Sequence, residues 1–160
     1  MRFEKVSLEE FTRASGFDFD KAKELYNDIQ LPHRSTKYSA GYDFYLPYTV
    51  VIPRGAQAMV ATGIRVLLDL SNVLLCFPRS SLGIKHGVGL KNTVGVIDAD
   101  YYYNADNEGH IMACLTNLGD HAIRLDAGDR FMQGIILPYY TVDDDTSNDT
   151  RRGGIGSTGV

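Results

Sequence analysis

The stretch from Tyr38 to Tyr140 is a series of short β-rich segments, and this feature most constrains how the chain can fold. Turn residues such as Pro47, Gly83 and the Gly128-Asp129 pair separate the segments. They read YDFYLP, TVVIP, AMVATGIRVLL, NVLLCF, NTVGVID, HIMACLTN, HAIRL and FMQGIILPYY. Many short strands at roughly regular spacing are typical of a β-sandwich or barrel. We therefore expect an all-β domain over residues 38–140.

Residues 1–37 show a helical pattern instead. The segment Ser7-Leu8-Glu9-Glu10 fits a capping box, which predicts a short helix over residues 8–14. Asp20 is the expected N-cap of a second helix that ends near residue 28. The first 37 residues are thus predicted to form a helical extension of the β-domain.

The C-terminal 20 residues, 141–160, contain no hydrophobic period that could build a core. Residues 141–150 are polar and acidic, which is typical of a linker or mobile arm. Residues 151–160 read RRGGIGSTGV. Glycine backbone N–H groups, hydroxyls and guanidinium groups all donate hydrogen bonds to phosphate, so this segment could be a phosphate-binding arm. Its composition alone favours an ordinary disordered terminus.

Composition and charge limit the class of protein. The formal net charge of −4 gives no global attraction for nucleic acid or an anionic membrane. Cys76 and Cys114 lie in apolar runs without metal-ligand spacing, so we expect free thiols in a reducing compartment. The N-terminus has no signal-peptide pattern, and no apolar run reaches membrane-spanning length. A cytoplasmic protein is expected.

Two segments combine residue types that suit phosphate chemistry. Residues 77–83, FPRSSLG, end an apolar strand with a cation, two hydroxyls and a glycine, although an ordinary strand-to-helix cap has the same composition. Residues 92–101, NTVGVIDADY, run an apolar strand into two carboxylates and an aromatic ring. Burial and nearby charge can tune such a carboxylate as a general base. The alternative is a β-turn with solvated aspartates.

The joint order of five segments is more specific than any one of them. They are AGYD (40–43), PRSSLG (78–83), NTVGVIDADY (92–101), GDRFMQ (128–133) and RGGIGSTG (152–159). In this order they resemble the five motifs of the trimeric dUTPases, from about residue 38 to the C-terminus. The resemblance implies a distorted jelly-roll fold, a homotrimer with active sites between subunits, and hydrolysis of dUTP to dUMP and pyrophosphate. It also implies that each site is completed by the C-terminal arm of a third chain.

The resemblance also implies roles for individual residues. Asp98 would activate the water that attacks the α-phosphorus, and Tyr101 would pack against the deoxyribose and disfavour a 2′-hydroxyl. Arg79 would hold phosphate oxygens, Gln133 would touch the phosphate chain, and Asp43 would support Arg79 or the hydrated metal. The expected substrate-binding residues are Ser80, Ser81, Asn92, Gly95, Tyr101, Met112, Arg151, Arg152, Ile155, Gly156, Ser157 and Thr158. Mg²⁺ would be held through substrate phosphates and water, with no dedicated protein cage.

Three departures from the family pattern stand out. Ile155 replaces the usual aromatic residue, so it can cover the base but cannot stack as a ring. Thr150 stands where the family's arginine is usual, which leaves Arg151 or Arg152 to act from a shifted position. Residues 102–108 look like an insertion in the hairpin after the catalytic strand, a variation seen in dUTPases of phages and their bacterial hosts.

Two alternatives accompany this interpretation. A dCTP deaminase shares the jelly roll and the Arg-Ser-Ser segment, but it needs an extra carboxylate on the strand after the hairpin, and residues 110–115 contain none. A dUTPase could also act as a protein-binding regulator through residues 102–108, because tyrosine is enriched at interfaces.

Overall fold

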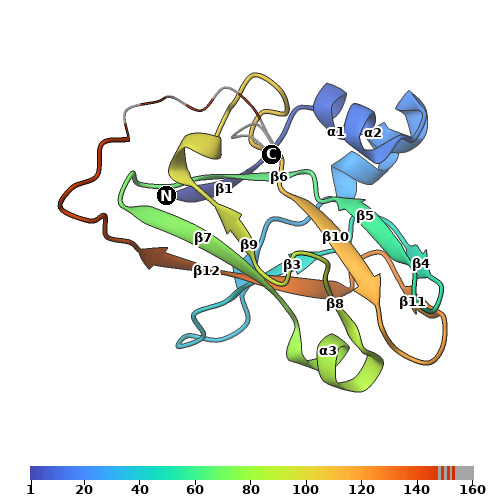
Figure 1. The fold of residues 1–160 in the computed structure, drawn as a ribbon. Coiled ribbons are helices and arrows are strands. Elements are labelled where there is room, and N and C mark those ends of the chain that lie inside the picture. Colours follow the sequence, from blue (N-terminus) through green and yellow to red (C-terminus); the bar gives the residue numbers. More distant parts are fainter. Residues whose placement is uncertain (148, 150, 152, 154–160) are drawn as a thin grey trace.

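The chain folds into packed antiparallel sheets with helices at their edges (Figure 1). The structure, a computed structural model, describes residues 1–147, 149, 151 and 153. The strands are β1 Arg2–Lys5, β2 His33–Arg34, β3 Tyr42–Tyr45, β4 Val50–Ile52, β5 Gln57–Ala61, β6 Ile64–Leu67, β7 Asn72–Pro78, β8 Val88–Leu90, β9 Gly95–Ile97, β10 Met112–Asn117, β11 Ile123–Leu125 and β12 Arg130–Pro138. The helices are α1 Leu8–Ser15, α2 Phe19–Asp28, α3 Ser80–His86 and the single 3₁₀ turn η1 Ala99–Tyr101.

Within the described residues the strands form one larger sheet and three smaller ones. The larger sheet has the order β2-β3-β12-β7-β9, and the others are β5-β10-β8, β1-β6 and β11-β4. Every pairing in this part of the chain is antiparallel. This arrangement confirms the expected all-β class.

The core lies between the sheets and is lined by residues that alternate along the strands. On β7, Leu74 and Cys76 are buried while their neighbours are less so, as expected when one face of a strand is covered. Other fully buried large side chains are Phe11, Phe44, Leu46, Ile52, Ile111, Leu115, Phe131 and Met132. Both cysteines are free thiols, as predicted.

The N-terminal segment shares this core. The first helix is confirmed at residues 8–15, and the Ser7 hydroxyl accepts from the Glu10 N–H. The predicted N-cap of the second helix is wrong: Asp18, two residues before Asp20, has the extended backbone and accepts from the Lys21 N–H. The segment also contains strand β1, which sequence patterning did not indicate.

Helices α1 and α2 lie together at the end of the sheets near β5 (Figure 1). Their apolar side chains close one end of the core, because Phe11 and Ala22 are fully buried and Ile29 nearly so. Gly63, at a positive φ of 72°, turns the chain between β5 and β6 beneath them. None of the helices in the described residues has the length and apolar character needed to cross a membrane.

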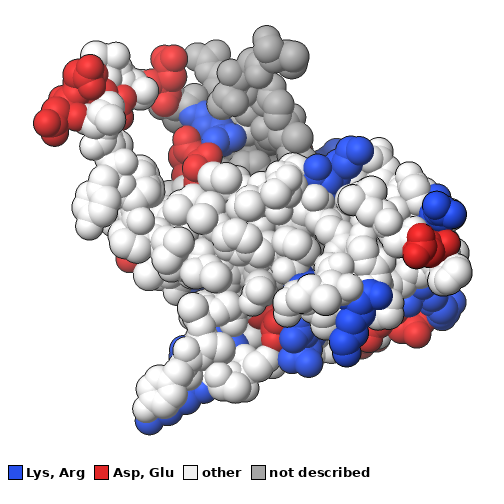
Figure 2. Space-filling view, turned by 60° about the horizontal axis from the view of Figure 1, so that its bottom comes forward, with Lys and Arg blue, Asp and Glu red and all other residues white. Residues whose placement is uncertain are grey.

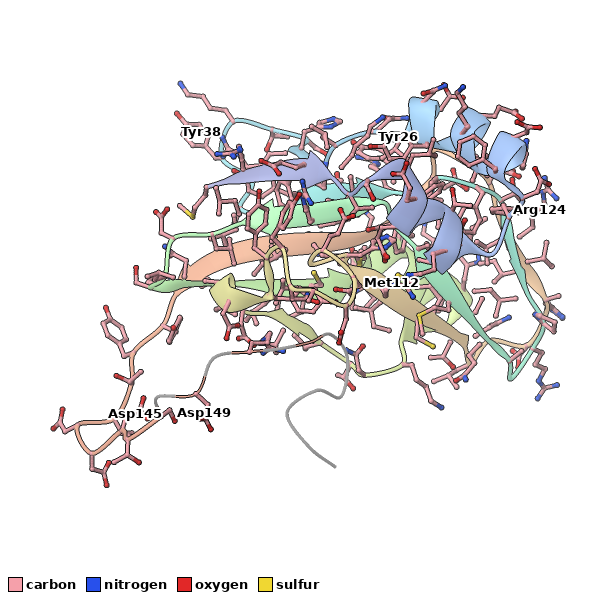
Figure 3. All side chains as sticks on the ribbon, turned by 90° about the horizontal axis from the view of Figure 1, so that it is seen from above. Tyr26, Tyr38, Met112, Arg124, Asp145 and Asp149 are labelled. Atoms are coloured by element: carbon pink, nitrogen blue, oxygen red, sulfur yellow. The ribbon has the colours of Figure 1, made fainter. Side chains whose placement is uncertain are left out.

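The acidic segment after β12 leaves the body of the molecule and turns back. Asp145 and Asp149, labelled in Figure 3, lie on a projection away from the sheets, on the opposite side from Arg124. The chain then returns far enough for Arg151 to contact the end of β9.

Candidate active site

The first candidate cluster lies where β9 ends. Asp98 follows this strand with an extended backbone and precedes the 3₁₀ turn, and its side chain makes no cap hydrogen bond there. The carboxylate is 47% exposed, so solvent or a ligand can reach it. Asp100 is similarly exposed at 52%. The strand thus delivers two partly exposed carboxylates to the surface.

Arg151 covers both of these carboxylates. Its Nη2 lies 2.6 Å from Asp98 Oδ2 and its Nε lies 2.9 Å from Asp100 Oδ1. Its guanidinium carbon is 5.8 Å from the centre of the Tyr101 ring. These contacts bring Arg151 of the tail to the third motif of the same chain. The linker is long enough to fold back onto its own chain.

Tyr101 is the most enclosed residue of this cluster. Its hydroxyl donates to the His110 carbonyl at 2.9 Å and accepts from Asn107 Nδ2 at 2.7 Å. Burial raises the pKa of the phenol, so the hydroxyl stays protonated and can donate. The sequence did not indicate Asn107 and His110, because the loop that brings them to the Tyr101 hydroxyl has no recognisable motif.

The second cluster surrounds Asp43 on β3. Asp43 is 6% exposed and accepts from Ser35 Oγ at 2.6 Å and from Arg130 Nη1 at 3.2 Å. Arg79 Nε lies 3.6 Å from its other oxygen, which agrees with the expectation that Asp43 supports Arg79. Arg130 and Ser35 are additions that sequence reasoning missed, because only cross-strand folding brings them to this carboxylate.

Gln133 belongs to the same cluster through strand register. It pairs with Asp43 across β3 and with Phe77 across β7. Its side chain lies over Gly41, where an added Cβ would approach Gln133 Oε1 to 2.6 Å. The glycine of the first motif therefore makes room for the glutamine of the fourth.

A cavity of about 380 Å³ adjoins this cluster. Ser80 and Ser81 lie in the first turn of α3, and both are exposed. The cavity is lined by Arg79, Ser81, Leu82, His86, Ile123, Arg124, Leu125, Asp129 and Arg130. Its three arginines pair with carboxylates just outside the lining: Arg79 and Arg130 with Asp43, and Arg124 with Asp126. Guanidinium groups carry several N–H donors, which suit a phosphorylated ligand.

A separate, mostly apolar pocket of about 250 Å³ brings together Asn92 and Met112. Met59, Lys91 and Cys114 complete its lining. Gly95 begins β9 opposite Cys76, with its Cα so close that an added Cβ would lie 3.2 Å from the cysteine Cβ. An amide beside apolar side chains can bind a flat polar ring, which is the role expected for Asn92.

The two clusters lie at opposite ends of β7. Ile97, the neighbour of Asp98, pairs with Leu74, whereas Arg79 follows the other end of the same strand. At 3.3 Å per residue, the five steps from Leu74 to Arg79 span about 16 Å. One copy of the chain therefore separates Asp98 from the Asp43–Arg79–Gln133 cluster.

Several expectations concern residues outside the described part of the chain. They are Arg152, Ile155, Gly156, Ser157 and Thr158. Among the described residues, no group of three or more His, Cys, Asp or Glu side chains is arranged to hold a metal ion.

Comparison with known proteins agrees with the motif order. A family model described as dUTPase matches residues 27–159. A deoxyuridine 5′-triphosphate nucleotidohydrolase of Lactococcus lactis is 41% identical over 134 residues, covering 82% of this chain and 89% of the relative. One from Hahella chejuensis is 37% identical over 146 residues, covering 86% and 92%.

Solved structures show the same fold. The crystal structure of a dUTPase from Streptococcus mutans has a TM-score of 0.71 and 36% identity, covering 89% of this chain and 99% of that one. A dUTPase from phage φ11 of S. aureus has a TM-score of 0.64 at 21% identity, so it supports the fold alone. The expected jelly-roll-like architecture is confirmed, and the chain belongs to the dUTPase family of nucleotide-hydrolysing enzymes.

Proposed function

We propose that the protein hydrolyses dUTP to dUMP and pyrophosphate, with Asp98 as the base. The observation that carries this proposal is a half-exposed carboxylate at the end of β9, beside an enclosed tyrosine, in a chain of the dUTPase family. Asp98 would take a proton from a water molecule as its oxygen attacks the α-phosphorus. The bond from the α-phosphorus to the bridging oxygen breaks, and pyrophosphate leaves.

The separation of the two clusters supports a homotrimer. Adjacent phosphoryl groups of one triphosphate lie much closer together than the roughly 16 Å from Leu74, the partner of Ile97, to Arg79. A complete site therefore combines Asp98 and Tyr101 of one subunit with the Asp43–Arg79–Gln133 cluster of another.

Exposed apolar side chains are available for such an assembly. Val96, on the edge strand β9, is 59% exposed, and Met59, on the edge strand β5, is 54% exposed. Figure 2 shows a face whose middle carries few charged side chains, while charges gather along its margins. A centre poor in charge with a polar rim is typical of subunit interfaces.

The arginine-lined cavity beside α3 is the proposed phosphate subsite. Arg79, Ser80 and Ser81 would bind the β- and γ-phosphates, and Gln133 would contact the phosphate chain. Asp43 orients Arg79 by sharing its charge between two guanidiniums. Stabilising the charge of the leaving pyrophosphate in this way lowers the barrier without any further covalent step.

The nucleoside would occupy the pocket of Asn92 and Met112 with the deoxyribose against Tyr101. The Asn92 amide and backbone groups from Gly95 onward would recognise the uracil edge, and Met112 would contact the base. A 2′-hydroxyl would meet the Tyr101 ring, which gives the preference for deoxyribose.

The C-terminal arm is proposed to close over the bound triphosphate. Arg151 contacts Asp98 and Asp100, and a triphosphate would offer its guanidinium stronger acceptors. Arg152, Ser157 and Thr158 would add phosphate contacts, and Ile155 with Gly156 would cover the base. Ile155→Phe should then tighten nucleotide binding by up to about 1–3 kcal/mol, the usual range for base stacking.

Mg²⁺ would accompany the triphosphate as a phosphate-bound, hydrated ion. The oxygen donors of Asp98 and Asp43 suit contact with its water shell, since Mg²⁺ prefers oxygen and retains several waters. When bound, the ion neutralises phosphate charge. The protein residues orient the substrate and move the proton.

The test is pyrophosphate release from dUTP, dTTP, dCTP and UTP in the presence of Mg²⁺. The proposal predicts a strong preference for dUTP, and equal turnover of the four nucleotides would refute it. Ammonia release from dCTP would instead identify a deaminase. A protein-binding role for residues 102–108 stays a prediction; Tyr102 and Tyr103 lie against Glu4 and Arg65 of their own chain.

A further inference from the structure

The loop that follows Tyr101 is docked on the N-terminal segment. Glu108 accepts from the Ser7 N–H at 2.9 Å and from Arg65 Nη1 at 3.0 Å. The Tyr102 hydroxyl donates to Glu4 at 2.8 Å. The insertion and the start of the chain therefore form one connected structure.

Inside this contact lies a buried pair, Glu10 and His110. His110 is 0% exposed, and its Nε2 accepts from the Gly63 N–H at 2.8 Å. Nδ1 must then carry the proton of the neutral ring, and it donates to Glu10 Oε1 at 3.0 Å. Arg13 holds Glu10 from the solvent side through two hydrogen bonds of 2.9 and 3.0 Å.

The backbone of His110 connects this pair to the active site. Its carbonyl accepts from the Tyr101 hydroxyl at 2.9 Å, and its N–H donates to the Asn107 carbonyl at 2.8 Å. Asn107 Nδ2 in turn donates to the same tyrosine hydroxyl at 2.7 Å. The position of the Tyr101 ring is therefore set by a residue that is itself locked by helix α1.

We propose that Glu10 and His110 are positioning residues that hold the Tyr101 ring in place and thereby set the preference for deoxyribonucleotides over ribonucleotides. The inference rests on the proposed function, in which Tyr101 contacts the sugar. A ring excludes a 2′-hydroxyl only while it cannot move away. Small displacements near the reacting substrate have large effects on rate.

The test compares three single variants in helix α1 with the full-length protein. Glu10→Ala removes the acceptor of His110 Nδ1–H, Glu10→Gln keeps an oxygen acceptor there, and Glu9→Ala removes an exposed carboxylate from the same turn. For each variant, kcat/KM is measured with dUTP and with UTP, together with the melting temperature.

Glu10→Ala is expected to lower the ratio of kcat/KM for dUTP over UTP by about tenfold or more. Glu10→Gln is expected to keep most of the wild-type ratio, and Glu9→Ala all of it. A residue with a merely structural role would change the melting temperature and leave the ratio unchanged.

An unchanged ratio in a folded, active Glu10→Ala variant would overturn the inference while leaving the proposed function intact. A wild-type protein that turns over no dUTP would overturn both. If Glu10→Ala does not fold, Tyr101→Phe is measured instead, because it removes the hydrogen bond from the Tyr101 hydroxyl to the His110 carbonyl. Its ratio of kcat/KM for dUTP over UTP must also fall for the inference to stand.

Discussion

Gly63 offers a sharp test of whether the N-terminal helices are part of the core. Its φ of 72° is a conformation that L side chains rarely adopt. A Cβ at this position would overlap Ile29 Cδ1 and lie 3.3 Å from Phe11 Cδ2, both of which belong to the helical segment. Gly63→Ala therefore strains the backbone and also pushes against α1 and the residue that caps α2.

A matched glycine separates these two effects. Gly55 has a nearly identical φ of 73°, and an added Cβ there meets nothing within 4 Å. An alanine in this left-handed conformation destabilises the folded state by about 1–2 kcal/mol. Alanine also lowers the conformational entropy of the unfolded chain relative to glycine, which offsets about 0.4–1 kcal/mol of that loss. Overpacking adds about 1–3 kcal/mol at Gly63 alone. Gly55→Ala should therefore cost about 1 kcal/mol and Gly63→Ala about 2–4 kcal/mol.

The assay is urea unfolding of both variants and the wild type at one protein concentration, because an oligomer's stability depends on concentration. The informative quantity is the difference between the two variants, in which backbone strain and unfolded-state effects cancel. Equal destabilisation by the two substitutions would refute the packing of Ile29 and Phe11 against the β5–β6 turn.

Three further predictions concern Asp43, His110 and the C-terminal arm. Asp43→Asn should destabilise the fold by about 1–3 kcal/mol and lower kcat/KM for dUTP, because Arg79 and Arg130 lose the carboxylate that they share. Urea unfolding measures the first effect and steady-state kinetics the second, and wild-type values in both would contradict the role of Asp43. Burial lowers the pKa of His110, so its contribution to stability is complete above pH 6.5 and is lost as the pH falls toward the folded-state value. Urea unfolding at several pH values measures how steeply the free energy of unfolding falls as the pH is lowered below 6.5. His110→Gln should remove the contribution of His110 to this slope, at most about 1.4 kcal/mol per pH unit, whereas His121→Gln at the surface should leave the slope unchanged. Deleting residues 151–160 should leave the oligomer intact by light scattering and cripple dUTP turnover; full activity would show that the arm is dispensable.

Most β-segments could be predicted because alternation and turn residues are local signals. The segments around Phe44, Leu74 and Leu115 all form strands of the core. The run AMVATGIRVLL predicts one segment, but Gly63 divides it into β5 and β6. Strand β1 was missed because a four-residue strand with three charged side chains has no clear alternation, and its partner is remote in sequence.

The chemistry of the site was predictable only where motifs carry it. Asp98, Tyr101 and the Asp43–Arg79 contact follow from motif order. Other contacts could not be predicted because folding brings together residues that are distant in sequence. These contacts are the hydrogen bonds of Asp43 with Ser35 and Arg130, and that of Tyr101 with His110. The N-cap at Asp18 instead of Asp20 depends on backbone geometry, since both residues have the same side chain.

In the proposed function, Asp98 activates the water that hydrolyses dUTP. Asp98→Asn is the most direct test, because the half-exposed side chain can keep its contact with Arg151 and the fold should not change. Pyrophosphate release from dUTP with Mg²⁺ should fall by roughly 10²–10⁴-fold, the usual contribution of a positioned general base. Turnover at the wild-type rate by a folded Asp98→Asn enzyme would show that another residue activates the water.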